Sequence, residues 1–470
     1  MRSRDSIKGA LKLYSITPYS LPSLPFIMGF SQVKAGAEAH QELPPIEALP
    51  VDVLLDIMRQ LPDIKSLMDF TKASPSAFRA FHFDQGIVLQ GILSRELGPH
   101  LPVAVARLEA AEAEWRPVRP FKTAVDPELF HQHIAEFCRG YLDGQEEEIR
   151  VPPSYFTLDK ALKLWSFNDC VLYWTEGLSM YVSNQTGGGT FRWCSTPYYR
   201  RFNEIEKHRV KKVLYLSEIV SILLPVRYGP NQPVDQDVDW QNFWACFAPW
   251  EFCQYVELQE VLCSFHQQDL YRLPDFDTVS RRNAVPGISK ILALQMGLEA
   301  SVTLLEGFPI LERKMPKPSR KRYSDIAVQI VKQAESTSNI SYRSSMCRSS
   351  HPPHRIMSEY KTIWLEKLGT SNGTTIYSLD PKRIKQKYKD LDPGPLACWL
   401  FDVLRYDQRP WQHYPVVRGQ PRQFIMTAFW RRRRWDSERI PLMPPLADLE
   451  SDAGRHVLTE DNEIVPRMWT

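Results

Sequence analysis

Three aspartates in the middle of the chain have the alternating spacing of a calcium-binding loop. Asp235, Asp237 and Asp239 would supply its first carboxylate ligands. Such a loop needs glycine at its sixth position for a sharp turn and glutamate at its twelfth, and these positions are Trp240 and Cys246. The pattern therefore predicts no calcium site, and we interpret the aspartates as exposed carboxylates ahead of a helix.

Two groups of histidine and cysteine residues have spacings that occur in metal sites. Their members are Cys347, His351 and His354 in a Ser-, Arg- and Pro-rich segment, and His131, His133 and Cys138 further upstream. A closed structural zinc site needs four ligands, and each group supplies fewer. We therefore predict no metal ligands and no cofactor in this chain.

Motifs for phosphate binding and nucleophilic catalysis are incomplete. The glycines at 187–189 are not followed by the Lys-Ser or Lys-Thr pair of a phosphate-binding loop. Ser179 follows Gly177 by two residues, but Tyr181 stands where the nucleophile elbow of a hydrolase has glycine. No Ser-His-Asp or Cys-His set can be assembled from the spacing. The sequence predicts a protein without catalytic residues, which acts by binding and not as an enzyme.

Three short helices that could position binding residues are predicted within residues 49–83. The first has apolar residues at the spacing of one helical face. These residues are Val51, Leu54, Leu55, Met58 and Leu61. Asp63 is a favourable N-cap for the second helix. Ser74 followed by Pro75 indicates the start of the third, because serine caps a helix well and proline fits its first position.

This segment resembles the F-box. The matching residues are Leu49-Pro50, Asp52, Leu54-Leu55, Ile57-Met58, Leu61-Pro62, Ile64 and Leu67. The continuation from Ala73 to Phe81 looks like the form common in filamentous fungi. It departs from many F-boxes at its end, where Ser74-Pro75 and Phe78 stand in place of a Cys-Arg-Trp-like group.

The resemblance implies a binding partner, the Skp-type adaptor of cullin–RING ubiquitin ligases. A unit of this size buries too little surface to be stable alone, and it contains no cysteine to form a disulfide or hold a metal. Apolar surface left over after its helices pack would bind another chain. On the resemblance, the adaptor-binding residues are Leu49, Pro50, Leu54, Ile57, Leu61 and Leu67. An amphipathic helical segment with a purely structural role is the alternative.

The rest of the chain is expected to be mainly helical. Long amphipathic helices are predicted at Glu204–Leu224, with a Lys/Arg-rich outer face, and at Pro249–Tyr271. The predicted fold is predominantly α: a short N-terminal three-helix F-box followed by a large, mainly helical body with a flexible basic insertion. The chain is predicted to begin with a disordered leader at 1–43, followed by the F-box at 44–90 and the helical body at 91–312. A flexible Ser/Arg/Lys-rich linker is predicted at 313–357. The Trp-rich C-terminal part of the body, with a disordered tail, is predicted at 358–470. Whether the body is one domain or two stays open, as does the presence of residues 1–27 in the working protein.

Composition limits the compartment and the partners. The 470 residues have a formal net charge of +3, which gives no global argument for binding nucleic acid. No apolar run is long enough to span a membrane. The 8 cysteines form no Cys-x-x-Cys pair, which favours reduced thiols. We expect a location in the cytoplasm, the nucleus or both, and no membrane partner.

Two local basic clusters support an alternative function. Lysines and arginines gather within residues 313–322, which suits either a nuclear-import signal or a solvated linker. Arg431–Arg434 are flanked by Trp430 and Trp435, so this cluster could bind nucleic acid or simply pair with acidic neighbours.

The function predicted first is that of a substrate receptor of an SCF-type (cullin–RING) ubiquitin ligase, with an unknown protein substrate. The alternative is a nuclear nucleic-acid-binding or chromatin-associated helical protein.

Overall fold

The computed structural model describes residues 46–117, 126–142, 151–184, 201–224, 237–271, 289, 292–294, 296–305, 328 and 395. Within these residues the secondary structure is helical and no strand occurs. The predicted predominantly α fold is therefore confirmed for the part of the chain that the structure describes. The predicted leader lies outside the described residues. So do the basic linker and the C-terminal part of the body, apart from two isolated positions.

The N-terminal helices follow the predicted boundaries closely. They are α1 (Val51–Gln60), α2 (Ile64–Ala73) and α3 (Pro75–Phe83). The Asp63 side chain accepts a hydrogen bond from the Ser66 N–H at 2.6 Å, and the Ser74 hydroxyl accepts one from the Ala77 N–H at 3.1 Å. Both predicted N-caps are therefore confirmed, and each satisfies a backbone donor that the helix itself leaves without a partner.

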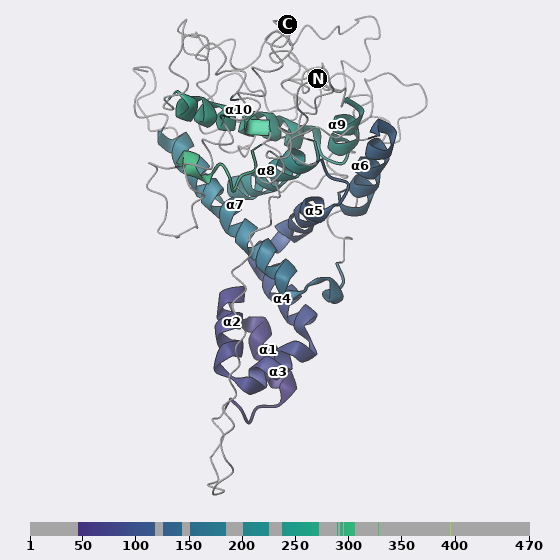
Figure 1. The fold of residues 1–470 in the computed structure, drawn as a ribbon. Coiled ribbons are helices and arrows are strands. Elements are labelled where there is room, and N and C mark those ends of the chain that lie inside the picture. The colour runs from purple at the N-terminus through teal and green to yellow at the C-terminus, as the bar shows by residue number, and fades with distance from the viewer. Residues whose placement is uncertain are drawn as a thin grey trace, which may run out of the picture.

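The fourth helix leads from this N-terminal unit into the body. It is α4 (Gln85–Leu97), and it ends at Gly98. Gly98 has a positive φ of 53°, a conformation that glycine adopts without steric strain because it has no Cβ atom. The short 3-10 helix η1 (Gly98–His100) and α5 (Leu101–Glu112) follow directly. Figure 1 shows α1, α2 and α3 together at one end of the molecule, with α4 extending from them toward the other helices.

The body contains the longest helices among the described residues. Its further elements are α6 (Pro127–Tyr141), the 3-10 turn η2 (Pro153–Tyr155), α7 (Leu158–Asn184), α8 (Glu204–Leu223), α9 (Asp237–Trp244), α10 (Pro249–Leu270) and the 3-10 turn η4 (Val302–Leu305). A capping box formed by Asn203 and Glu206 starts α8. None of the helices in the described ranges combines the length and apolar character needed to cross a membrane.

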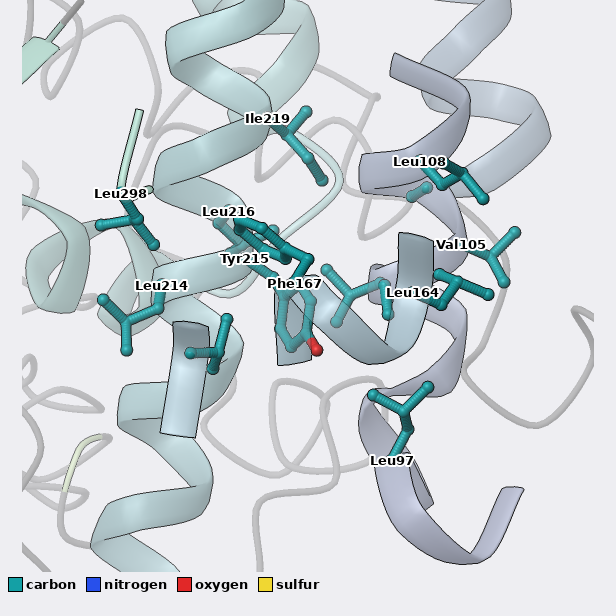
Figure 2. Packing of buried hydrophobic residues seen from close by; sticks show 14 of the residues in the cluster. Leu97, Val105, Leu108, Leu164, Phe167, Leu214, Tyr215, Leu216, Ile219 and Leu298 are labelled. Atoms are coloured by element: carbon teal, nitrogen blue, oxygen red, sulfur yellow. The ribbon is translucent and has the colours of Figure 1, made fainter. Parts of the chain in front are cut away.

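Helix α8 lies at the centre of the body, packed against α5, α7 and α10. Figure 2 shows Tyr215 of α8 beside Phe167 of α7, with ring centres 5.5 Å apart. All residues from 213 to 221 are buried. The Lys/Arg-rich outer face predicted for this helix lies in its first half, where Lys207, Lys211 and Lys212 are half-buried and Arg209 is buried.

A buried ion pair crosses this core. The guanidinium of Arg107 on α5 lies 3.4 Å from the carboxylate of Glu218 on α8, and 3.7 Å from the centre of the Phe167 ring. The same carboxylate accepts a hydrogen bond of 2.7 Å from the Leu298 N–H. Trp174 of α7 donates its indole N–H to the Leu298 carbonyl at 3.0 Å. Glu218 thus joins α5, α8 and the segment ahead of η4.

The N-terminal unit is also held to the body through residues 151–155. The side chain of Gln90 on α4 donates a hydrogen bond of 3.0 Å to the Val151 carbonyl. Turn η2 packs against α4, and α2 contacts α7. Since α4 belongs to both parts, these contacts give the N-terminal unit a defined orientation relative to α7.

Candidate protein-binding site

We define the N-terminal module as residues 46–90, which include α1 to α3 and the start of α4. Its interior is built from one apolar face of each helix. The buried residues are Leu54, Leu55, Met58, Ile64, Leu67, Ala77, Ala80, Phe81, Val88 and Leu89. The spacing of these residues in the sequence explains why each helix forms, since a stripe on one face must be covered by the others.

Two of the six predicted adaptor-binding residues belong to this interior. Leu54 is 1% exposed and Leu67 is 0% exposed, so neither side chain is available at the module surface. The side chains of Leu49, Ile57 and Leu61 are half-buried, and Pro50 is exposed. The structure therefore divides the predicted set into residues that hold the helices together and residues that a partner could contact.

Four large apolar residues outside the predicted set are exposed on the same module. Val51 and Val53 of α1 are 47% and 42% exposed, Phe83 at the end of α3 is 83% exposed, and Ile87 of α4 is 38% exposed. Val51 belongs to the predicted apolar face of its helix, but unlike Leu54, Leu55 and Met58 it is exposed. Val53 could have been found from the sequence, because it lies off the apolar stripe. The exposure of Phe83 could not have been predicted, because the apolar residues just before it in α3, up to Phe81, are buried.

Charged side chains fix the relative positions of the module helices. Arg95 of α4 donates hydrogen bonds to the carbonyls of Arg59 and Leu61, the latter at 2.5 Å, and so caps the carboxyl end of α1. Arg59 in turn lies 3.0 Å from Asp56 and 3.6 Å from Asp84. These partly exposed ion pairs contribute little to stability individually. The first lies within α1, whereas the second connects α1 to Asp84, the N-cap residue of α4.

Glu47 connects the chain ahead of α1 to the start of α3. Its carboxylate accepts hydrogen bonds from the Ser74 hydroxyl at 2.5 Å and from the Ser76 N–H at 3.0 Å. The side-chain hydrogen bonds from Ser74 and Ser76 hold the pKa of Glu47 below its usual value. A single residue, Ala48, separates Glu47 from Leu49 and Pro50.

The predicted loose group of His131, His133 and Cys138 does not converge. His131 contacts Asp239 of α9, whereas His133 stacks on Trp115 with ring centres 5.2 Å apart. Residues two apart on a helix point in different directions, which explains this separation. Within the described ranges, no three His, Cys, Asp or Glu side chains are placed to share a metal ion.

The structure also corrects the interpretation of Asp239. We expected an exposed carboxylate ahead of a helix, but Asp239 lies inside α9, is 0% exposed and pairs with His131 of α6. A carboxylate in this position needs a partner, because an ionised group buried without one is strongly unfavourable. The contact joins α6 to α9, two elements that are far apart in the sequence.

Other residues of chemically reactive types are buried in the helical body. Ser179 is fully buried, and its hydroxyl accepts a hydrogen bond of 2.9 Å from the Phe202 N–H. Burial lowers the pKa of His100 to about 2 and that of His266 to about 3, so both imidazoles are neutral near pH 7. Burial also raises the pKa of the Cys170 thiol. None of these groups is poised for nucleophilic or acid–base chemistry at neutral pH.

Glu109 forms the centre of a polar junction between helices. It accepts hydrogen bonds from Tyr155 at 2.6 Å, from Lys160 at 3.0 Å and from Tyr141 at 3.2 Å. Burial alone would raise the pKa of Glu109, but the hydrogen bonds from Tyr155 and Lys160 outweigh it and lower the pKa. The junction links α5 with α6, η2 and α7.

The remaining predicted features fall outside the described residues. They are the glycines at 187–189, the group of Cys347, His351 and His354, and the basic clusters at 313–322 and 431–434. The structure therefore places none of the residues on which the nucleic-acid alternative depends.

Comparisons with models of protein families, with curated proteins and with solved structures gave no match. Function is therefore inferred from the residues of this chain and their arrangement.

Proposed function

We propose that the N-terminal module is an F-box that binds a Skp-type adaptor, and that the chain acts as a substrate receptor of a cullin–RING ubiquitin ligase. The observation that supports this most strongly is the set of exposed apolar side chains on the module. Val51, Val53, Phe83 and Ile87 are exposed on a unit of about forty residues that already buries one face of each helix. We propose that these four side chains form one exposed patch, because a contiguous apolar patch marks a protein interface whereas single exposed apolar residues do not.

The size of these side chains suits a stable complex. Complete burial of a valine, isoleucine or phenylalanine side chain contributes roughly 1.5–3 kcal/mol. A few central anchors usually supply most of the free energy of binding at a protein interface. Phe83 is the strongest candidate anchor, because it is the largest and the most exposed of the four. Pro50 and the half-buried Leu49, Ile57 and Leu61 would surround these anchors.

In this role the chain needs no catalytic residue of its own. The module would hold the adaptor, the helical body would bind a protein substrate, and the ligase would supply the chemistry. The continuity of α4 and the contacts of residues 151–155 support this division, because they give the module a defined orientation relative to the body. Ubiquitin transfer to a bound substrate benefits from such positioning.

The proposal is tested by titrating the full-length chain with a purified fungal Skp-type adaptor. We expect a stable complex that is weakened at least tenfold by Val53→Asp and by Phe83→Asp. Leu129→Asp is the matched control, because Leu129 is an apolar residue of α6 that is 49% exposed but lies outside the module. Retained binding by the two module variants, or an equal loss in the control, would contradict the proposal.

A further inference from the structure

Glu47 makes a long-range contact for which the F-box resemblance gives no reason. Its two carboxylate oxygens accept hydrogen bonds from Ser74 and from the backbone of Ser76, which are 27 and 29 residues further along the chain. The contact fastens the segment just ahead of α1 to the amino end of α3. Because the partners lie at the start of a helix, a negative charge is favoured there by the helix dipole.

Ser74 mediates this contact through both functions of its hydroxyl group. The oxygen accepts a hydrogen bond from the Ala77 N–H and so caps α3, while the hydrogen is donated to Glu47. Glu47 also satisfies the N–H of Ser76, one of the amino-terminal donors that a helix leaves without an internal partner. Arg79, one turn into α3, adds a favourable charge that contributes to the lowered pKa of Glu47.

The short segment around Glu47 is also held by packing, because Ile46 and Leu49 are partly buried against the hydrophobic core. Between Glu47 and α1 lie Ala48, Leu49 and Pro50, of which Ala48 and Pro50 are exposed. The Leu49 N–H donates a hydrogen bond of 3.3 Å to the Ile46 carbonyl, which closes a turn around Glu47. The Pro50 carbonyl accepts the first bond of α1, from the Leu54 N–H at 3.0 Å. The hydrogen bonds of Glu47 therefore tie this turn to α3, in addition to the packing of Ile46 and Leu49.

We infer that Glu47 is a positioning residue for the adaptor interface. It holds Leu49 and Pro50 in the binding conformation before the adaptor arrives, and it does so through α3 without contacting the adaptor itself. This inference rests on the proposed function. Its physical basis is preorganisation: when only a fraction of the molecules has the binding conformation, the apparent dissociation constant rises by the inverse of that fraction.

The test compares the full-length chain with its Glu47→Ala and Glu47→Gln variants in two measurements. Hydrogen exchange without the adaptor reports on the contact itself. We expect the Ser76 amide to exchange faster in Glu47→Ala, and circular dichroism to show that helix content is kept. Titration with a purified fungal Skp-type adaptor reports on the role. We expect about tenfold weaker binding for Glu47→Ala, mostly through a slower association rate. A smaller loss is expected for Glu47→Gln, whose amide oxygen can still accept from Ser76.

The outcomes separate the two levels of the proposal. Faster Ser76 exchange together with unchanged adaptor affinity would mean that Glu47 only caps α3, and the positioning role would be wrong. An equal loss of affinity in Glu47→Gln and Glu47→Ala would also contradict it. If the unaltered chain does not bind the adaptor at all, the proposed function fails, and the role of Glu47 fails with it.

Discussion

Gly86 of α4 lies directly against the backbone of Pro153 in η2: a Cβ atom on residue 86 would stand 2.2 Å from the Pro153 carbonyl oxygen. No side chain can occupy that space unless the backbone moves. The contact lies where the N-terminal module meets the body. Glycine at this position therefore allows η2 to pack on α4 and, with the hydrogen bond from Gln90 to Val151, sets how the two parts meet.

Substitution of Gly86 should therefore disturb the junction. We expect Gly86→Ala to lower the free energy of unfolding by about 1–3 kcal/mol, the usual effect of overpacking. Urea denaturation followed by circular dichroism measures this change. Gly140→Ala is the matched control, since Gly140 is also helical and nothing lies within 4 Å of its missing Cβ. There we expect no loss, or a gain of up to about 1 kcal/mol from the better helix propensity of alanine. Equal effects at the two glycines would contradict the close packing.

The buried and exposed residues of the module should respond differently to truncation. Leu67→Ala removes a fully buried side chain and should lower the free energy of unfolding by about 2–5 kcal/mol. Val53→Ala removes an exposed one and should change stability by less than about 0.5 kcal/mol. Denaturant titration of both variants measures this difference. A large loss of stability in Val53→Ala would show that Val53 packs within the chain and is not free for a partner.

The Glu218 carboxylate should be essential for the body core. Glu218→Ala leaves Arg107 without its buried counter-ion and the Leu298 N–H without its acceptor, so we expect a loss of about 3–5 kcal/mol. Glu218→Gln keeps an oxygen for Leu298 and should cost less. Urea denaturation followed by circular dichroism is a suitable measurement. A loss below about 1 kcal/mol in Glu218→Ala would contradict the proposed importance of the ion pair.

The junction at Glu109 predicts a defined dependence of stability on pH. The pKa of Glu109 is lower in the folded chain than its ordinary value of 4.5, so this carboxylate stabilises the fold above pH 4.5. That contribution disappears as the pH falls through the lowered, folded-state pKa. The difference in melting temperature between the unaltered chain and Glu109→Gln should therefore be largest near neutral pH and shrink in acid. A difference that is independent of pH down to the acid transition would rule out this assignment.

Local signals in the sequence were sufficient to predict the helices of the module. Asp63 and Ser74 each accept a hydrogen bond from the backbone N–H three residues further on, so their capping role depends only on neighbouring residues. The same holds for the end of α4 at Gly98, where a single residue ends the helix. Helix type and boundaries in this part of the chain are therefore properties of short segments.

The burial of individual side chains and the contacts between distant residues could not be predicted from such local signals. Val51 fits the apolar stripe of α1, yet it is 47% exposed, whereas Leu54, three residues further on, is buried by the other helices. Asp239 is buried because His131, 108 residues earlier, approaches it from α6. Residues 213–221 of α8 are all buried because three helices pack around them. Each of these outcomes depends on tertiary packing between segments that are distant in the sequence.

The central claim is that the exposed apolar residues of the module bind a Skp-type adaptor. Its most direct test is hydrogen exchange of the full-length chain with and without a purified fungal adaptor. We predict that the adaptor slows exchange in residues 47–57 and in residues 81–88, while α8 and α10 are unaffected. No complex, or protection confined to the helical body, would contradict the assignment of the module as an F-box.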